Sequence, residues 1–219
     1  MKYITVILFF IHVVTYGQDF KQAVLDMQQL LKDAKQMRIV MDVNVYESEK
    51  KRSLLYHDKI EVNKDMDNYL YHYGNNDFLM NKDYVMMVDK NEKEIMLRKR
   101  DVKSERELQR KISFNIDSLL SLYDEAPQYV ATENNSDHFL VHQRGSEVTK
   151  IDLYISRYTH LIQRMDYSYR TGQYVTIQFN EFDLQPKFPE NKFGESNYVQ
   201  HVKGEIYPTG VYKTFRLVN

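Results

Sequence analysis

Histidine is the side chain that most readily suggests chemistry in this chain, because neutral imidazole is a common metal ligand. His138 and His142 are four residues apart in a predicted strand, so they share one face of it, and His160 follows closely in the sequence. The three could together bind a metal ion. However, Asp137 falls in a predicted turn, and no neighbouring residue stands where it would orient the imidazoles. We therefore favour surface histidines on tyrosine-rich strands, and we predict no metal and no other cofactor.

A second histidine pair, His57 and His72, lies in two consecutive predicted strands. The two side chains could be cross-strand neighbours, which would place two titratable groups side by side. We favour the alternative that each is a half-exposed strand residue.

Nucleophilic catalysis has the residue types that it needs here, but not their spacing. Serine, histidine and aspartate are present, yet there is no Gly-x-Ser-x-Gly, no His-Glu-x-x-His and no glycine-rich phosphate loop. The chain also contains no cysteine, which excludes a cysteine nucleophile, thiolate metal sites and disulfides. We predict that the chain is not an enzyme.

Basic residues cluster at Arg98, Lys99 and Arg100, and Lys103 and Arg106 follow them. Such a cluster could meet a lipid phosphate or another anionic partner. Surface exposure is the default for these residue types, so we favour a solvated strand end.

The amino-terminal segment has the pattern of a secretory signal peptide. Lys2 is a short positive region, residues 4–14 are mostly apolar, and Thr15 and Gly17 are small residues at the −3 and −1 positions of a cleavage site. A retained membrane anchor is the alternative, although the apolar stretch is short for a spanning helix. Cleavage after Gly17 would leave 202 residues, and the absence of cysteine excludes a lipid-anchored product. We predict a periplasmic protein that does not span the membrane; secretion beyond the envelope stays open.

Length and charge limit the classes of partner. Without Lys2, the chain has 29 basic and 31 acidic residues, a net charge of −2. This near-neutral balance argues against nucleic acid, and against an anionic membrane surface, as the partner. The remaining length suits one domain with a sizeable core. We expect that domain over residues 18–219, with residues 185–219 as a C-terminal extension.

Two amphipathic helices are predicted to support any site. The first covers residues 19–36, with Asp19 as its cap, and its apolar stripe consists of Phe20, Val24, Met27, Leu31 and Ala34. The second begins at the capping pair Ser104 and Glu107 and ends before Pro127. Its apolar stripe consists of Leu108, Ile112, Ile116, Leu119, Leu120 and Tyr123.

Between the helices the apolar period changes to two, which is typical of half-buried strands. Tyr69, Tyr71 and Tyr73, for example, share one face. Gly74 and Asn75 begin the strongest turn, because both residue types tolerate positive φ. The spacing predicts an antiparallel meander with strands at residues 37–46, 53–62, 68–73, 78–80, 84–88 and 94–99.

Strands resume after the second helix. They are predicted at residues 128–132, 138–142, 147–155, 160–169 and 174–184. Residues 197–203 and 211–218 are weaker candidates for short strands, and the last of these could instead be a tail along the rim of the sheet.

This order of elements resembles the LolA/LolB-like fold, the half-open β-barrel of periplasmic lipoprotein carriers and their relatives. The resemblance rests on a helix at residues 20–31 and on residues 37–46, 67–74, 78–89 and 94–97, and it extends over residues 20–184. It implies an α+β fold in which a curved antiparallel sheet forms a half-open β-barrel and two amphipathic helices cover its concave face. Those carriers lock their lid with a characteristic arginine. Arg38 lies on the first predicted strand, but the sequence does not establish its register, so Arg38 is not matched to that arginine.

The resemblance also implies an apolar cavity between sheet and helices, which holds acyl chains in the carriers. We predict a non-enzymatic binder or carrier of an apolar ligand, either a lipid or the acyl chain of a lipoprotein. Flexible methionine suits such a lining, although ordinary cores also use it as filler. The alternative is an envelope protein–protein interaction module with a self-filled core, in which residues 185–219 contact a protein partner. The predicted lining consists of Met37, Ile39, Met41, Val43, Val45, Tyr69, Tyr71, Met86, Val88, Met96, Leu161, Met165, Tyr167, Val175, Ile177, Phe179 and, in the second helix, Leu108, Ile112 and Ile116.

Overall fold

The computed structural model describes residues 20–50, 53–101, 127–143 and 147–218. The predicted signal peptide and the predicted second helix, with Leu108, Ile112 and Ile116, lie outside these residues and stay predictions. Within the described ranges, no helix has both the length and the apolar character needed to cross a membrane.

The first block of strands is the predicted meander, in which each strand pairs antiparallel with the next. Its turns follow the residue types that the sequence offers; Gly74, for example, adopts a φ of +50° between the third and fourth strands. The strands are β1 (Gln36–Tyr46), β2 (Leu54–Asp65), β3 (Asn68–Tyr73), β4 (Asn76–Met80), β5 (Tyr84–Asp89) and β6 (Glu94–Lys99).

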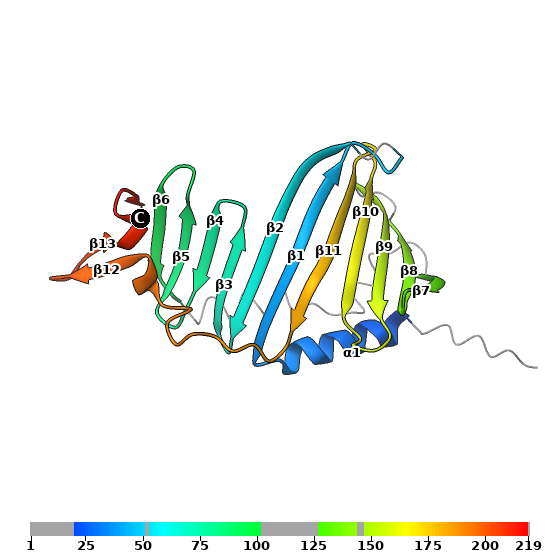
Figure 1. Cartoon of the computed structure of the whole chain (residues 1–219), viewed down its shortest axis with the longest axis horizontal. Helices are drawn as coiled ribbons and strands as arrows, with labels where there is room; N and C mark the ends of the chain where they lie inside the picture. The colour runs from blue at the N-terminus through cyan, green and yellow to red at the C-terminus, as the bar shows by residue number, and fades with distance from the viewer. Residues whose placement is uncertain (1–19, 51–52, 102–126, 144–146, 219) are drawn as a thin grey trace, which may run out of the picture.

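The second block continues the same sheet from the other side of β1. Its strands are β7 (Gln128–Glu133), β8 (Ser136–His142), β9 (Val148–Ser156), β10 (Ile162–Tyr169) and β11 (Tyr174–Asp183). β1 joins the blocks, because it pairs antiparallel with both β2 and β11. The result is one 12-stranded sheet in the order β14-β6-β5-β4-β3-β2-β1-β11-β10-β9-β8-β7 (Figure 1).

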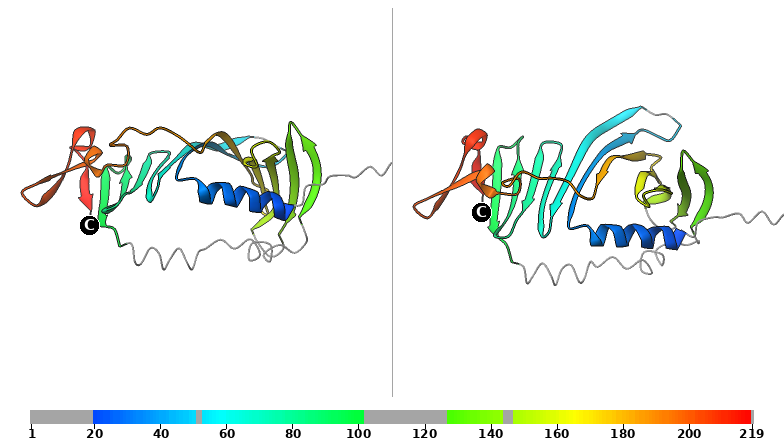
Figure 2. Two further views of the ribbon diagram at one scale, coloured as in Figure 1. Left: turned by 90° about the horizontal axis from the view of Figure 1, so that it is seen from below. Right: turned by 60° about the horizontal axis from the view of Figure 1, so that its bottom comes forward.

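One face of the sheet, here called the helix face, packs against α1 (Phe20–Asp33). The strands arch over this helix, as Figure 2 shows. The rings of Phe20 and Phe139 meet edge-on with centroids 5.2 Å apart, and Ala23 and Val24 are buried beside them. This first cluster lies on the half of the sheet formed by β8 to β11, and its strand residues are Phe139, Val141, Leu153, Ile155 and Ile162.

The opposite face is covered on the other half, over β3 to β6. Leu70, Leu79, Met86 and Leu97 lie directly across from one another there. The covering segment follows β11 and contains η1 (Glu195–Asn197), β12 (Val199–Val202), β13 (Glu205–Pro208), η2 (Gly210–Tyr212) and β14 (Arg216–Val218). The buried residues of this face form a second cluster. The segment after β11 contributes Phe193, Tyr198 and Val199 to it.

The curved antiparallel sheet and the first amphipathic helix are therefore confirmed. The half-open barrel and the pair of covering helices are not: the sheet is open, with β7 and β14 as its two edges, and the described residues contain one α-helix. Alternation within a strand reports which face is buried, whereas barrel closure depends on pairing between strands far apart in the chain, so the sequence pattern could not decide it. The C-terminal extension is part of the core, and β14 adds to β6 in parallel.

Candidate functional site

Beyond α1, the helix face continues over β2 to β6 with apolar side chains that are only partly buried. Cross-strand pairing places Val62, Tyr71, Phe78, Met87 and Met96 in one row. Ile39 continues this row onto β1. Met87 is 43 % exposed and Met96 is 50 % exposed, whereas Met86, on the opposite face of the same strand as Met87, is fully buried.

Aromatic rings fill the centre of this surface. Tyr69 and Tyr71 stack with ring centroids 6.1 Å apart, and Phe78 meets Tyr71 edge-on at 5.7 Å. Burial raises the pKa of both tyrosines, so their hydroxyls stay neutral at physiological pH. The surface therefore presents rings, thioethers and uncharged hydroxyls. We call it the Tyr–Met patch, defined by Tyr69, Tyr71, Phe78, Met80, Met87 and Met96.

The structure brings together most of the predicted lining. The predicted residues of β1 lie on one face, as expected. The predicted residues of β11 lie opposite those of β1, and the predicted residues of β10 lie opposite those of β11. α1 packs over the part formed by β8 to β11, and the Tyr–Met patch is the part beyond it. The predicted residues on the helix face are Met37, Ile39, Met41, Val43, Val45, Tyr69, Tyr71, Met96, Met165, Tyr167, Val175, Ile177 and Phe179.

Three predicted residues lie elsewhere. Met86 and Val88 point to the opposite face and are buried in the second cluster, 0 % and 1 % exposed. Four consecutive apolar residues from position 85 to 88 give no alternation, so the sequence alone could not tell which two face the helix side. Leu161 is buried in the turn before β10, which begins at Ile162, and a register shift there moves Ile162 into the first cluster.

Phe78, Met80 and Met87 belong to the patch but were not predicted. Phe78 and Met80 lie in a strand too short to show a period, and Met87 was left out because its neighbours Met86 and Val88 were predicted as the lining residues of that strand. The signal that identifies them is the pairing across the Gly74 turn, which sets Tyr71 opposite Phe78 and Tyr69 opposite Met80.

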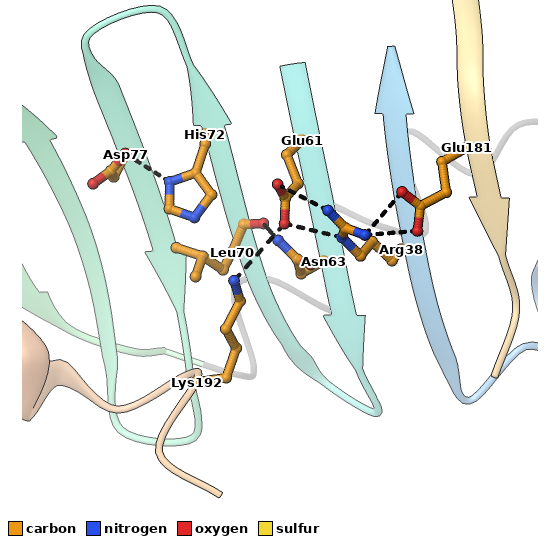
Figure 3. A network of polar contacts seen from close by, with 8 residues as sticks. All are labelled: Arg38, Glu61, Asn63, Leu70, His72, Asp77, Glu181 and Lys192. Atoms are coloured by element: carbon orange, nitrogen blue, oxygen red, sulfur yellow. Dashed lines mark hydrogen bonds and ion pairs between the residues drawn. The ribbon is translucent and has the colours of Figure 1, made fainter. Parts of the chain in front are cut away.

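Arg38 lies on the face opposite α1, at the junction of three strands. Its guanidinium donates to Glu61 on β2, at 3.2 Å from Nε, and to Glu181 on β11, at 2.6 Å from Nη1 (Figure 3). Lys192, from the C-terminal segment, lies 3.8 Å from Glu61. A pocket of about 340 Å³ lies beside this network, with Pro186 among its lining residues. Because it points away from α1 and is held by two carboxylates, Arg38 is not placed to lock a helix onto the helix face.

The three histidines do not converge: His142 lies opposite Lys150 in the β8–β9 pair, and His138 and His160 have separate partners. The carboxylate of Asp152 accepts a hydrogen bond from His138 Nε2 at 2.8 Å, and the His138 ring stacks on Tyr154. His160 lies 3.7 Å from Asp26 of α1. Among the residues that the structure describes, no three potential ligands gather into a metal site.

His57 and His72 are not cross-strand neighbours. His72 lies opposite Glu61 in the β2–β3 pair, whereas His57 lies opposite Asn44 in the β1–β2 pair. His72 bonds the buried Asp77 at 2.8 Å, and His57 bonds Asn44 at the same distance. His57 is exposed and His72 is partly buried, and each has a partner on a neighbouring strand.

The basic cluster at the end of β6 borders a pocket of about 570 Å³ that Lys99, Arg100, Lys82 and His201 help to line. Arg100 Nη1 donates to the backbone carbonyls of Asp67 and Asn81, so this side chain ties neighbouring turns together. Lys103 and Arg106 lie outside the described residues.

No family model matches the chain, and no curated protein matches it. Several solved structures are similar to it. An uncharacterized conserved protein from Thermus thermophilus has 8 % identity, over 79 % of this chain and 91 % of that one, with a TM-score of 0.49. Lipoprotein LppX of Mycobacterium tuberculosis has 11 % identity, over 77 % of this chain and 97 % of that one, with a TM-score of 0.44.

A LolA superfamily protein from Nitrosomonas europaea has 8 % identity, over 81 % of this chain and 98 % of that one, with a TM-score of 0.34. The solved structures similar to this chain therefore include a protein named as a LolA superfamily member. With identities this low and TM-scores below one half, these similarities show neither a ligand nor a partner for this chain.

Proposed function

We propose that this chain binds an apolar ligand with an acyl chain on the Tyr–Met patch and carries it without chemical change. The observation that supports the proposal is the contrast between the two faces of β3 to β6. On the opposite face Leu70, Leu79 and Met86 are buried, whereas on the helix face Met87 and Met96 stay about half exposed. Covering apolar surface is favourable by about 25 cal/mol per Å², so a partly exposed apolar row gains from an apolar ligand.

The shape and chemistry of the row favour an extended hydrocarbon. It crosses six strands from Ile39 to Met96, which corresponds to about 24 Å at the usual spacing of neighbouring strands. Methionine adapts to ligands of variable shape, and the hydroxyls of Tyr69 and Tyr71 offer neutral hydrogen-bonding groups to a polar headgroup. A protein partner on the C-terminal extension is not favoured, since Phe193, Tyr198 and Val199 of that segment are committed to the second cluster.

The test compares methionines of similar exposure inside and outside the patch. Met87→Lys combined with Met96→Lys places two ammonium groups on the row, whereas Met66→Lys changes a 55 % exposed methionine in the turn between β2 and β3. We expect the double variant to lose at least about tenfold in affinity for a fluorescent fatty acid, because a buried charge costs several kcal/mol. The Met66 variant should bind as the unchanged chain does.

Solvent extraction of gently purified protein provides an independent readout. We expect it to release a copurified acyl compound from the unchanged chain and much less from the double variant. A chain that carries no acyl compound and takes up no fluorescent fatty acid would contradict the proposal.

We also propose that the chain is exported to the periplasm as a single domain over residues 18–219, with residues 1–17 as a cleaved signal peptide. The support is the order of Lys2, the apolar residues 4–14 and the small residues Thr15 and Gly17. Amino-terminal sequencing of the exported protein should begin at Gln18. A mature protein that retains Lys2 would contradict this proposal.

A further inference from the structure

A polar pocket that the proposed function does not use lies on the face of the sheet opposite α1. It has a volume of about 230 Å³, and the adjacent strands β8 to β11 contribute Ser136, Tyr154, Arg164 and Gln178 to its lining. Ile155, the residue after Tyr154, points to the other face and is buried in the first cluster with α1. Pockets for drug-sized ligands measure roughly 300–1,000 Å³, so this one suits a small ligand or a single unit of a longer one.

A β-bulge brings an additional side chain to this pocket. The register of β10 on β9 shifts between Ile162 and Arg164, so Gln163 is an extra residue without a partner on β9. Ile162 is buried in the first cluster, whereas Gln163 and Arg164 both line the pocket. Bulges often re-aim side chains beside functional sites. This one places two polar side chains next to each other where regular alternation would give one.

Buried partners hold these two side chains in place. Ser136, which is 3 % exposed, donates from Oγ to Gln163 Oε1 at 2.7 Å. Asp166, which is 1 % exposed, accepts a hydrogen bond from Arg164 Nε at 2.8 Å and lies 2.6 Å from Arg164 Nη2. Support of this kind, on strands rather than loops, is what keeps a binding site in one geometry.

Several polar groups of the pocket have no protein partner among the described residues. Gln163 presents its Nε2 donor, because its oxygen accepts from Ser136. Gln178 donates from Nε2 to the backbone carbonyl of Gln163 at 3.0 Å, so its own side-chain oxygen is the acceptor that stays available. The hydroxyl of Tyr154 is neutral, because burial raises its pKa. The pocket therefore presents neutral donors and acceptors next to each other.

A tight turn adds one more amide. β7 ends at Glu133 and β8 begins at Ser136, so Asn134 and Asn135 form the turn between them. Both adopt positive φ, 48° and 63°, which is typical of the type I′ turn of a hairpin and suits asparagine. Asn134 lines the pocket from this turn.

The charges and rings of the pocket argue against an ionic or an apolar ligand. The guanidinium of Arg164 is compensated by Asp166, and Glu133 is the other charged side chain of the lining, which disfavours an anion. No three potential metal ligands gather in the part of the chain that the structure describes. The ring of Tyr154 is flanked by His138, with centroids 4.4 Å apart, and by the guanidinium of Arg164, 5.2 Å from its centroid. An apolar ligand would therefore find no open ring face.

We propose that this pocket binds a neutral saccharide through its hydroxyl groups. A hydroxyl both donates and accepts, so neighbouring sugar hydroxyls can pair with an amide donor and an amide acceptor that lie next to each other. Gln163 and Gln178 offer this pair, and the sugar contacts the hydroxyl of Tyr154 rather than its ring face. The site lies on the face opposite the Tyr–Met patch, so the inference holds whether or not the patch binds an acyl chain.

A peptide is the competing ligand, because its backbone also carries amide donors and acceptors. Peptide recognition, however, usually adds pockets for side chains to the main-chain hydrogen bonds. The lining here offers amides, hydroxyls and charged groups beside the one flanked ring, so a peptide side chain gains little from it.

Backbone amide NMR spectra of the purified chain test the proposal. The probes are maltotriose and chitotriose, the trimer of N-acetylglucosamine, at millimolar concentrations. We expect at least one of them to shift the amide signals of Tyr154, Gln163 and Gln178 and to leave those of Met87 and Met96 on the Tyr–Met patch unchanged. Inorganic phosphate and trialanine, which stand for an anion and a peptide, should not shift the signals of the pocket.

A double variant supplies the second measurement. Tyr154→Phe with Gln178→Ala removes a hydroxyl and an amide but keeps the bond between Ser136 and Gln163, and its spectrum outside the pocket reports that it is folded. We expect about a tenfold loss of affinity or more for the trisaccharide that binds, because two hydrogen bonds to the sugar are lost.

The matched control is Tyr207→Phe with Gln200→Ala, the same two changes at exposed residues that lie opposite each other in the β12–β13 pair. It should bind the trisaccharide as the unchanged chain does. The proposal is overturned if neither trisaccharide shifts the signals of the pocket, if phosphate or trialanine shifts them equally, or if the double variant keeps the full affinity.

Discussion

At the scale of single residues, Arg38 adds side-chain contacts to both blocks of strands at the place where β1 joins them. Its partners Glu61 and Glu181 come from β2 and β11, and the hydrogen bond to Glu181 connects positions 143 residues apart. Burial raises the pKa of Glu61, but hydrogen bonds from Arg38 and Asn63 outweigh it, so the net effect is a lowered pKa. Glu61 therefore adds stability above its unfolded pKa, and this stability is lost as the pH falls through the lower folded pKa.

Arg38→Met should test this arrangement. The variant leaves two carboxylates close together without their shared cation, so we expect it to lose about 1–3 kcal/mol of unfolding free energy at neutral pH. The loss should shrink well below the usual glutamate pKa of about 4.3, where both carboxylates become protonated. Urea unfolding at neutral and acidic pH measures the difference.

Arg98→Met is the matched control for Arg38→Met, because Arg98 is exposed on β6. We expect it to change stability by less than about 0.5 kcal/mol at either pH. A loss in Arg38→Met that is the same at both pH values would show that the two carboxylates do not cause it.

Single residues also show where sequence reasoning stops. The alternation in β1 predicts the helix-face positions Ile39, Met41 and Val43 correctly, because the residues between them point to the other face. The same reasoning cannot place Met86, which lies in an uninterrupted apolar run. It also cannot find the partners of Arg38, since contacts across the sheet depend on pairings that a local pattern does not contain.

At the scale of elements, the C-terminal segment is the part that the sequence described least well. Its weak periodicity predicted only two candidate short strands, at residues 197–203 and 211–218, and β12 and β14 fall within them. The packing of the segment was not predicted: Phe193 is 8 % exposed and meets Phe188 edge-on at 5.2 Å. Asn81 strengthens this attachment, because its side-chain amide donates to the carbonyl of Phe193 and to Glu195. A segment held by isolated aromatic residues gives no period-two or helical signal, so its packing could not be read from the chain.

Phe193→Ala should loosen this segment. Removal of a buried ring leaves a cavity in the second cluster, and we expect a loss of about 3 kcal/mol in unfolding free energy. Limited proteolysis should then cleave between β11 and β14 before the rest of the chain. Val211→Ala, at a position 83 % exposed, serves as the control and should change neither measurement. An unaltered cleavage pattern in Phe193→Ala would show that the segment is held by its polar contacts instead.

At the scale of the whole molecule, one sheet supports two cores on opposite faces. α1 covers the helix face of β8 to β11, and the C-terminal segment covers the other face of β3 to β6. Within the described part of the chain, each half thus leaves its second face without a matching layer, and on the β3–β6 half that face is the Tyr–Met patch. Among the described residues, this arrangement of covers, more than any single residue, leaves a partly exposed apolar surface on the helix face of β3 to β6.

Two cores that share no residue should respond separately to damage. Phe139 is fully buried in the first cluster and Phe193 is nearly so in the second. We therefore expect that the losses of unfolding free energy in Phe139→Ala and Phe193→Ala add up, within about 0.5 kcal/mol, to the loss in the double variant. Hydrogen exchange should rise in β8 and β9 for the first and in β5 and β6 for the second. If either variant raised exchange equally in both halves, β1 and the Arg38 network would be transmitting the disturbance. The sheet would then behave as one cooperative unit in which the Tyr–Met patch and α1 are coupled.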